Sequence, residues 1–190
     1  MKSLKHKMSL KLKTFKLKKG FIQIYTGNGK GKTTAAIGQA VRAAGHRLKT
    51  YIVQFMKDHP YGEVESLKSL KQLITLEQFG NDEFVLKREH PDKKDVELAN
   101  NALAKARGKM LSGMFDLIIL DEICVAIYFR LLDVNEVLKL IEEKPEQVEL
   151  ILTGRYCPDE LIDKADLVTE MKEVKHYYQK GIIARKGIES

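Results

Sequence analysis

The sequence predicts an α/β fold in which helices cover both faces of a mostly parallel β-sheet. Two observations lead to this prediction. Short runs of apolar and β-branched residues alternate along the chain with stretches whose apolar residues recur every three or four positions. This is the pattern of buried strands alternating with amphipathic helices. In addition, a glycine-rich turn directly follows the first apolar run and leads into the first of these helices. The crossover rule restricts the connections to right-handed ones, but strand order cannot be deduced from the sequence.

The glycine-rich turn has the features of a phosphate-binding loop. It follows the apolar run 21–25 and consists of Thr26, Gly27, Asn28, Gly29, Lys30, Gly31, Lys32, Thr33 and Thr34. Glycines let backbone N–H groups approach an anion closely, and the helix that begins there adds its positive end. Lys32 supplies a mobile cation, and Thr33 supplies a hydroxyl ligand for Mg²⁺. The usual pattern carries glycine where this chain has Thr26, so the loop is a variant form. It indicates a three-layer P-loop NTPase-like fold of the RecA-like type.

A second part of the same site is predicted at residues 115–122. Four consecutive apolar residues there are typical of a central parallel strand that is buried on both faces. Asp121 and Glu122 follow at its carboxyl end, which is the edge where open α/β sheets bind ligands. Carboxylates at that edge can hold Mg²⁺ directly or through water. We therefore interpret this stretch as a Walker B motif, with Thr33, Asp121 and Glu122 as the metal ligands.

The other elements follow from periodicity and from breaking residues. The predicted strands span about residues 48–55, 73–79, 148–152 and 167–174. The predicted helices run from the loop to about Gly45, over 63–71, from Asp92 to Gly113, to about Leu131, over 134–142 and over 158–163. Residues 80–91 are polar and irregular.

The positive charge is concentrated at the N-terminus. The formal net charge is +7, yet residues 1–20 contain eight lysines and no acidic residue, which leaves the rest near −1. We therefore expect a basic arm over 1–20, either disordered or acting as a lid, and a single α/β domain over 21–190. The arm has one aromatic residue and no arginine, so it is poorly suited to nucleic-acid recognition. We expect neither a nucleic-acid partner nor a membrane-bound protein, because no apolar run reaches the length of a membrane span.

Several further residues are candidates for the site. Arg155, at the end of a predicted strand, is expected to clamp a triphosphate, and Arg42 either reaches phosphate or pairs with a carboxylate. Lys57, Asp58 and Glu63 belong to a segment that is either a lid or ligand contact or a solvated loop. Two cysteines, at positions 124 and 157, lack metal-ligand spacing and are expected to be reduced thiols of a cytoplasmic protein.

With these motifs in place, the chain resembles the P-loop type of ATP:corrinoid adenosyltransferase over about residues 21–189. The matching residues are the loop Thr26–Thr34 with Ala35 and Ala36; Val53, Gln54, Phe55, Gly62 and Glu63; Leu120, Asp121 and Glu122; and Thr153, Gly154, Arg155, Ala165, Asp166, Val174, Lys175, His176 and Gly181.

The resemblance implies a reaction. In this family the Co(I) of a reduced corrinoid attacks C5′ of ATP, and the whole triphosphate leaves. It implies ATP held in reverse orientation in the loop, Mg²⁺ or Mn²⁺ as cofactor, and Lys32, Glu122 and Arg155 as the catalytic residues. It also favours a homodimer, and an electron-donating flavoprotein is one candidate for the reductant. His176 is expected to have a structural role and not to be a cobalt ligand.

Aromatic side chains are expected to cover the corrin face, and Phe79 and Phe84 are the candidates. The chain departs from the family pattern here, because it has no tryptophan. Two other functions remain open. A P-loop kinase or NTP hydrolase would use Glu122 as a base, and a nucleic-acid-binding ATPase would use the lysine arm.

Overall fold

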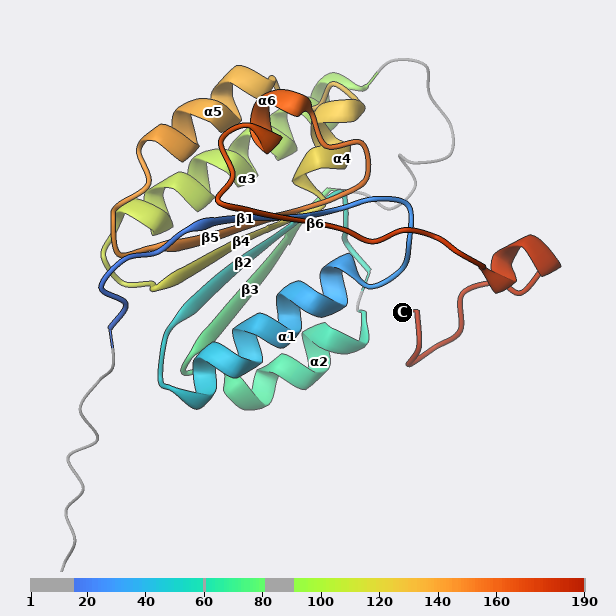
Figure 1. The fold of residues 1–190 in the computed structure, drawn as a ribbon, viewed down its shortest axis with the longest axis horizontal. Coiled ribbons are helices and arrows are strands. Elements are labelled where there is room, and N and C mark those ends of the chain that lie inside the picture. The colour runs from blue at the N-terminus through green and yellow to red at the C-terminus, as the bar shows by residue number, and fades with distance from the viewer. Residues whose placement is uncertain (1–15, 60, 81–90, 190) are drawn as a thin grey trace, which may run out of the picture.

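A single parallel sheet forms the centre of the computed structural model, which describes residues 16–59, 61–80 and 91–189 (Figure 1). The strands are β1 (Ile22–Thr26), β2 (Thr50–Phe55), β3 (Ile74–Phe79), β4 (Leu117–Asp121), β5 (Glu149–Thr153) and β6 (Leu167–Glu170). Their order across the sheet is β3-β2-β4-β5-β1-β6, and every neighbouring pair is parallel. The predicted fold class is confirmed, and the order places β5 between the loop strand β1 and the Walker B strand β4.

Helices cover both faces of the sheet, as Figure 1 shows. One face carries α1 (Lys32–Gly45) and α2 (Gly62–Leu67), and α2 continues as the 3₁₀ helix η1 (Lys68–Leu70). The other face carries α3 (Lys93–Leu111), α4 (Ile123–Tyr128), α5 (Val134–Glu142) and α6 (Asp159–Ile162). The chain ends with a segment that leaves β6, contains the 3₁₀ helix η3 (Tyr177–Lys180) and extends beyond the carboxyl ends of the strands.

The apolar run of β4 explains how the two faces are held. Successive side chains of a strand point to opposite faces. Accordingly, Ile118 and Leu120 belong to the core under α3 to α6, whereas Leu117 and Ile119 belong to the core under α1. All four side chains are at most 2% exposed. A central strand of this kind has no solvated face, so its apolar residues are consecutive instead of alternating.

The last strand is shorter than predicted. We expected a strand over 167–174, but β6 ends at Glu170. It is an exposed edge strand that, among the described residues, pairs only with β1, from Gln23 to Thr26. Beyond Thr26 the chain of β1 turns into the loop, so the residues after Glu170 have no strand to pair with. Helix α4 also ends earlier than predicted, at Tyr128, and η3 was not predicted.

Residues 16–20 of the predicted arm are joined to the domain, and residues 1–15 lie outside the described part. The Gly20 N–H donates to the Glu146 carbonyl at 2.7 Å, and the Lys144 ammonium donates to the Gly20 carbonyl at 3.0 Å. A Cβ atom at Gly20 would lie 2.2 Å from the backbone of Val148, so only glycine fits there.

Within the described residues, none of the helices combines the length and the apolar character that a membrane crossing needs.

Candidate active site

A cavity of about 620 Å³ opens where the loop meets the carboxyl ends of the strands. Its walls come from the loop, the start of α1, the segment before and within α2, the residues after β4 and β5, and the C-terminal segment. The lining residues are Gly29, Lys30, Gly31, Lys32, Thr33, Thr34, Ile37, Lys57, Tyr61, Gly62, Glu63, Ser66, Glu122, Arg155, His176, Gly187, Ile188 and Glu189. This is the edge at which parallel α/β sheets bind their ligands.

The loop needs its glycines for two separate reasons. Gly27 and Gly31 have φ angles of 93° and 117°, which L side chains rarely adopt. Gly27 and Gly29 also lie against the chain that follows β6, and a Cβ atom on either would be 2.6 Å from the carbonyl oxygen of Met171. The Gly29 N–H donates to that same oxygen at 2.6 Å. The loop is therefore fastened to the C-terminal segment.

Lys32 is buried at the centre of the loop. Its ammonium donates to the carbonyl oxygens of Gly27 and Gly29, both at 2.8 Å. Burial lowers the pKa of Lys32, and the carboxylates of Glu122 and Asp121 oppose this effect. A bound phosphate would favour the charged ammonium further, because an opposite charge nearby stabilises the charged form.

Asp121 holds the centre of a buried hydrogen-bond network. Its Oδ1 accepts from the hydroxyls of Thr33 at 2.8 Å and Thr153 at 2.7 Å. Its Oδ2 accepts from the Gln54 amide at 3.1 Å and from the Lys57 ammonium at 2.9 Å. Burial lowers the pKa of Lys57, but the Asp121 carboxylate more than offsets this, so the pKa is raised overall. Asp121 thereby fixes the loop threonine relative to β2, β4 and β5.

Glu122 faces the cavity, in contrast to its neighbour. Its backbone is left-handed, with φ 65°, and its N–H donates to Thr153 Oγ1 at 3.0 Å. Burial raises the pKa of the Glu122 carboxyl and the Asp121 charge adds to the rise, against the opposing effect of Lys57, Lys32 and Arg155. The Glu122 carboxyl is thus protonated more readily than usual, and a cation placed beside it would stabilise its ionised form.

Thr33 and Glu122 fit an Mg²⁺ ion better than Asp121 does. Both line the cavity, whereas the oxygens of Asp121 accept from four donors, one of which is an ammonium. The part of the chain described contains no group of three or more His, Cys, Asp or Glu side chains that could hold a metal. Mg²⁺ does not need such a group when substrate phosphates and water complete its octahedron.

Of the other predicted residues, Arg155 and Thr34 line the cavity and Asn28 is an exposed residue of the loop. Arg42 is not brought to the cavity. It lies in the last turn of α1 and donates to Gln39 at 3.2 Å. A helix rises about 1.5 Å per residue, so ten residues separate Arg42 from Lys32 by about 15 Å.

Of the two predicted corrin-facing residues, Phe79 does not line the cavity. Phe79 ends β3, packs against the core, and has the Lys105 ammonium 5.5 Å from its ring centroid. Phe84 lies outside the described residues. The sequence analysis did not identify Thr153 and Gln54 as hydrogen-bond donors to Asp121. Gln54 could have been recognised as a buried polar residue, because it is a polar residue within an otherwise apolar strand pattern.

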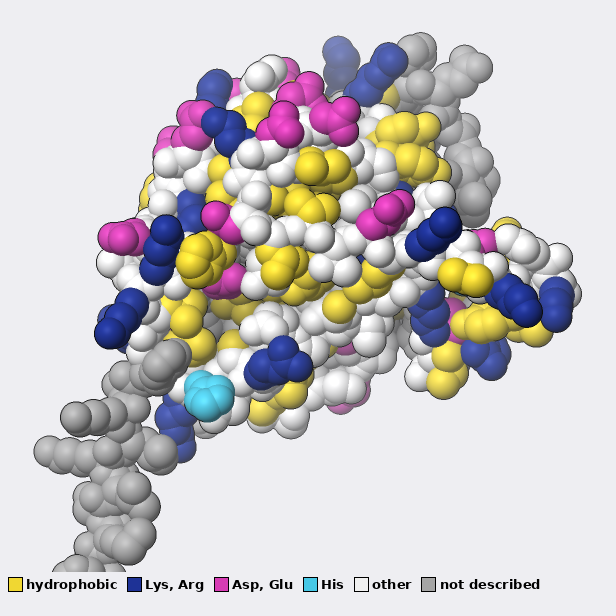
Figure 2. All heavy atoms as spheres, in the orientation of Figure 1, with side chains coloured by type: hydrophobic (Ala, Val, Ile, Leu, Met, Phe, Trp, Pro, Cys, Tyr) yellow, Lys and Arg dark blue, Asp and Glu magenta, His cyan; other side chains and the backbone are white. Residues whose placement is uncertain are grey.

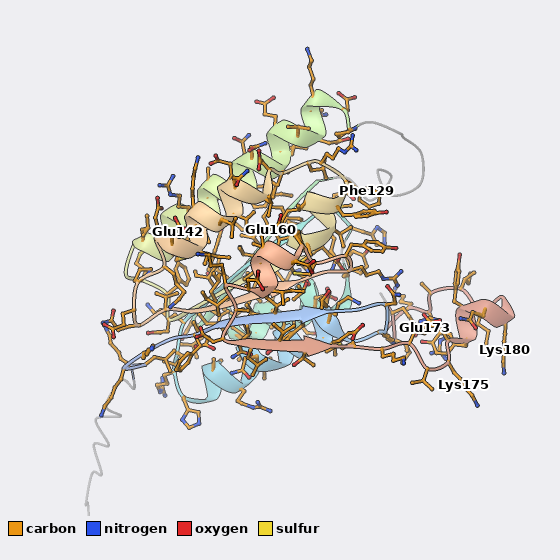
Figure 3. The ribbon with its side chains drawn as sticks, turned by 45° about the horizontal axis from the view of Figure 1, so that its top comes forward. Phe129, Glu142, Glu160, Glu173, Lys175 and Lys180 are labelled. Carbon is orange, nitrogen blue, oxygen red and sulfur yellow. The ribbon has the colours of Figure 1, made fainter. Side chains whose placement is uncertain are left out.

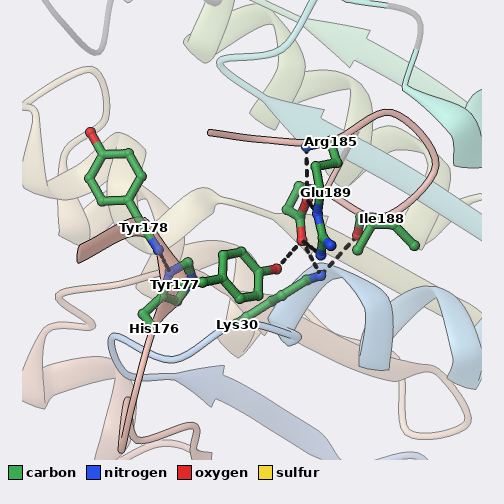
Figure 4. A network of polar contacts seen from close by, with 7 residues as sticks. All are labelled: Lys30, His176, Tyr177, Tyr178, Arg185, Ile188 and Glu189. Carbon is green, nitrogen blue, oxygen red and sulfur yellow. Dashed lines mark hydrogen bonds and ion pairs between the residues drawn. The ribbon is translucent and has the colours of Figure 1, made fainter. Parts of the chain in front are cut away.

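The C-terminal segment contributes a contact that the sequence analysis also missed (Figure 4). The Lys30 ammonium donates to the Ile188 carbonyl and to Glu189 Oε1, both at 2.9 Å. The Tyr177 hydroxyl and the Arg185 guanidinium also donate to Glu189. These donors, Arg185 first and Tyr177 next, hold the pKa of the Glu189 carboxyl well below its usual range. The segment therefore closes one wall of the cavity over the loop.

His176 lies on this wall and supports its fold. Its Nδ1 accepts the N–H of Tyr178 at 3.1 Å, so the imidazole caps η3. Figure 3 shows Glu173, Lys175 and Lys180 on the same segment, which lies beyond the carboxyl ends of the strands.

Comparison with known proteins connects this geometry to a family. Residues 18–190 match the family model "ATP:corrinoid adenosyltransferase BtuR/CobO/CobP". A corrinoid adenosyltransferase of Escherichia coli is 33% identical over 186 residues, which cover 97% of this chain and 93% of the relative. One from a Sinorhizobium species is 36% identical over 183 residues, covering 90% and 80%. Corrinoid adenosyltransferase CobA of Salmonella typhimurium is 32% identical over 172 residues, covering 90% and 86%.

The loop, Glu122 of the Walker B motif and Arg155 meet at one cavity, and the family match covers all of them. The chain therefore belongs to the ATP:corrinoid adenosyltransferase family.

Proposed function

We propose that this chain transfers the 5′-deoxyadenosyl group of ATP to the Co(I) centre of a reduced corrinoid at the cavity described above. A Co–C bond forms, the C5′–O bond of ATP breaks, and its electron pair leaves with the triphosphate. The observation that carries the proposal is the family match over residues 18–190, within which all the charged groups needed for a departing triphosphate face one cavity.

The main task of the protein is then to stabilise the charge on the leaving group. Lys32, Arg155 and the N–H groups of the loop supply positive electrostatic potential where the triphosphate departs. Thr33 and Glu122 would hold Mg²⁺, or Mn²⁺ in its place, which when bound neutralises phosphate charge. Asp121 positions Thr33 and keeps Lys57 beside the site.

Co(I) is itself a strong nucleophile, so the reaction needs no protein nucleophile. Cys124 suits this proposal. Contact with Cys157, followed by burial, raises the pKa of the Cys124 thiol, which favours the unreactive protonated form. What remains for the chain is to align cobalt with C5′ and to exclude water.

We further propose a cytoplasmic homodimer that receives electrons from a flavoprotein. Exposed apolar residues on the C-terminal segment support an association between copies: Val174, Tyr178 and Ile183 are 83%, 71% and 75% exposed. Figure 2 shows hydrophobic and basic side chains crowded on this segment. Sedimentation equilibrium of the full chain would test the dimer, and reduction assays with and without a reduced flavoprotein would test the electron donor.

Product analysis tests the reaction. The full chain is incubated under anaerobic conditions with ATP, Mg²⁺ and chemically reduced cobalamin, and the spectrum and phosphate products are followed. We expect a light-sensitive Co–C bond to form, and we expect one intact triphosphate to be released for each Co–C bond. The competing function is a P-loop kinase or NTP hydrolase in which Glu122, whose pKa is raised, serves as the general base. ADP or orthophosphate as the product, without a Co–C bond, would support that function instead.

A further inference from the structure

Left-handed backbone conformations gather at the edge of the sheet that carries the active site. Within the described part, the non-glycine residues with positive φ are Arg47, Met56, Glu122, Arg130 and Tyr156. Three of these, Met56, Glu122 and Tyr156, follow the carboxyl ends of β2, β4 and β5. A bulky side chain at positive φ is strained, and such strain tends to accumulate at functional sites. Glu122 already has a function there, which directs attention to Tyr156.

Tyr156 has a φ of 58°, where glycine would be relaxed, yet its ring is held in a defined place. It stacks on Tyr128, the last residue of α4, with ring centroids 4.1 Å apart and planes 25° apart. Phe129 meets Tyr128 edge to face, with centroids 5.3 Å apart. The two stacked tyrosines are 52% and 54% exposed. Strain that served only to build the core would be expected to bury the ring, but this pair leaves about half of each side chain open to solvent.

The stacked pair lies directly beside the ATP cavity. Arg155, which lines the cavity, is the residue before Tyr156. Gly154 brings the two loops together, because a Cβ atom there would be 2.8 Å from Cβ of Cys124 at the start of α4. Figure 3 shows Phe129 on the side of the molecule toward which the C-terminal segment extends, at the carboxyl ends of the strands.

We propose that Tyr156 and Tyr128 form an aromatic platform that binds the planar macrocycle of the corrinoid beside the ATP cavity. This inference rests on the proposed function and assigns a binding surface to its second substrate. The platform fits that substrate in three respects. The outer face of the ring stack is flat and aromatic, as the broad face of a macrocycle requires. Its phenol hydroxyls at the ring edges suit the amide groups around a corrin. Tyr156 directly follows Arg155, which lines the cavity, so a macrocycle bound on the platform lies close to the cavity.

Phe79, the corrin-facing residue predicted from the sequence that lies within the described part, is less suited to this role. Phe79 packs against the core and is approached by the Lys105 ammonium. A macrocycle on Phe79 would displace that cation, whereas the exposed faces of the tyrosines need no rearrangement. Tyr156 and Tyr128 are therefore proposed as substrate-binding residues, with no part in proton transfer.

The test separates binding of the corrinoid from binding of ATP and from folding. The variants are Tyr156→Gly, Tyr128→Ala and the conservative Tyr156→Phe, with Arg47→Gly as matched control. Arg47 has φ 61°, but it follows α1 at the opposite edge of the sheet. Steady-state KM is measured for ATP and for reduced cobalamin, and equilibrium dialysis gives the Kd of hydroxocobalamin with ATP and Mg²⁺ present.

We expect Tyr156→Gly and Tyr128→Ala each to raise the KM and Kd for the corrinoid about tenfold, the loss typical of one stacking contact with a planar ligand. KM for ATP should stay within about twofold. Tyr156→Phe keeps the stacking ring and loses only its hydroxyl, so it should weaken corrinoid binding much less than the two ring-removing variants do. Because glycine relieves the positive φ, Tyr156→Gly should melt no lower than the wild type. Arg47→Gly should share that stability without any loss of corrinoid affinity.

Unchanged corrinoid binding in both ring-removing variants would overturn the platform. So would a selective rise in KM for ATP, which would assign the rings to the adenine base. An inactive wild-type chain would contradict the proposed function and not the platform, because dialysis measures corrinoid binding without turnover.

Discussion

Two adjacent carboxylates, Asp121 and Glu122, illustrate how environment divides labour between identical groups. Asp121 ends β4 with both oxygens engaged, so it acts on the loop through Thr33. Glu122 has a left-handed backbone conformation, and its own side chain lines the cavity. The burial that makes Glu122 costly to ionise is the same feature that makes a bound cation favourable.

The first prediction concerns Lys32. Lys32→Ala should lower the rate of adenosyl transfer at saturating ATP by more than about 100-fold, because removing one preorganised charge from a leaving group costs a few kcal/mol. Single-turnover assays measure the effect, and circular dichroism checks the fold. Lys71→Ala, which removes an exposed lysine after η1, serves as control. Activity of Lys32→Ala within about threefold of the wild type would exclude the loop lysine from the chemistry.

The second prediction is that Glu122→Gln weakens the response to Mg²⁺ more than Asp121→Asn does. The reason is that Glu122 faces the cavity whereas Asp121 is saturated by donors. Titration of activity with Mg²⁺ measures both. If the Gln variant keeps the wild-type Mg²⁺ dependence, the ligand is another group, and Asp121 becomes the first candidate.

The same residue predicts a pH dependence with a definite sign. The folded pKa of Glu122 is raised above its ordinary 4.5. Its contribution to stability is therefore fully present below 4.5 and is lost as pH rises through the folded pKa. At neutral pH, Glu122→Gln should thus melt at or above the wild-type temperature. Since Mg²⁺ requires the ionised carboxylate, metal affinity of the wild type should fall on acidification, and the Gln variant should lack this limb. Thermal melts and Mg²⁺ titrations across pH would check both signs.

At this scale the sequence predicted the residues that belong to local motifs. Lys32, Thr33, Glu122 and Arg155 line the cavity because each directly follows a strand or forms part of the loop itself. The hydrogen-bond donors to Asp121 could not be predicted in the same way. Thr153 and Gln54 reach it from β5 and β2, and nothing in a single sequence reveals that these strands flank β4.

At the scale of elements, the segment after β6 is the part least accessible to prediction. Its few regular turns are held by contacts with the loop and not by their own periodicity. Met171 binds Gly29, and Glu189 binds Lys30 across 159 positions of sequence. The helices, by contrast, were predicted from local signals. Asp92 and Asp133 cap α3 and α5 by accepting N–H groups of Lys94 and Asn135, at 3.3 Å and 2.8 Å.

The third prediction is that Glu189→Gln lowers the KM for ATP. The Glu189 carboxylate forms an ion pair with Lys30, a residue predicted to bind phosphate. An anionic substrate would therefore compete with Glu189 for the Lys30 ammonium. Because the pair is partly exposed, the change should be modest, about threefold. Glu173→Gln, which alters another carboxylate of the segment that accepts from Gln179, is the control. A higher KM for ATP in Glu189→Gln would mean that the contact organises the site instead of competing for it.

At the scale of the whole molecule, the sheet order explains why residues far apart in the sequence meet at one cavity. With β5 between β1 and β4, the loop, Arg155 and Glu122 approach from three neighbouring strands. Alternation along the sequence predicted the layers but not this order, since strand pairing is a long-range property. The composition of the sequence likewise did not indicate where the basic arm joins the domain. Lysines continue to position 19, yet Leu17 already packs against the core and Gly20 is clamped by Glu146 and Lys144.

The fourth prediction concerns the arm. If it acts as a lid, its lysines should contact the triphosphate only when both substrates are present, because like charges repel until an anion binds. Residues 1–15 contain five of the eight lysines, and each is a potential trypsin cleavage site. We expect ATP and reduced cobalamin together to slow this cleavage, and deletion of residues 2–15 to raise the KM for ATP while the melting temperature stays unchanged. The anchors Leu17 and Gly20 remain in that variant, and a deletion extended through Gly20 should melt lower. Equal cleavage rates with and without ligands, combined with unchanged kinetics after deletion, would identify the arm as an inert leader.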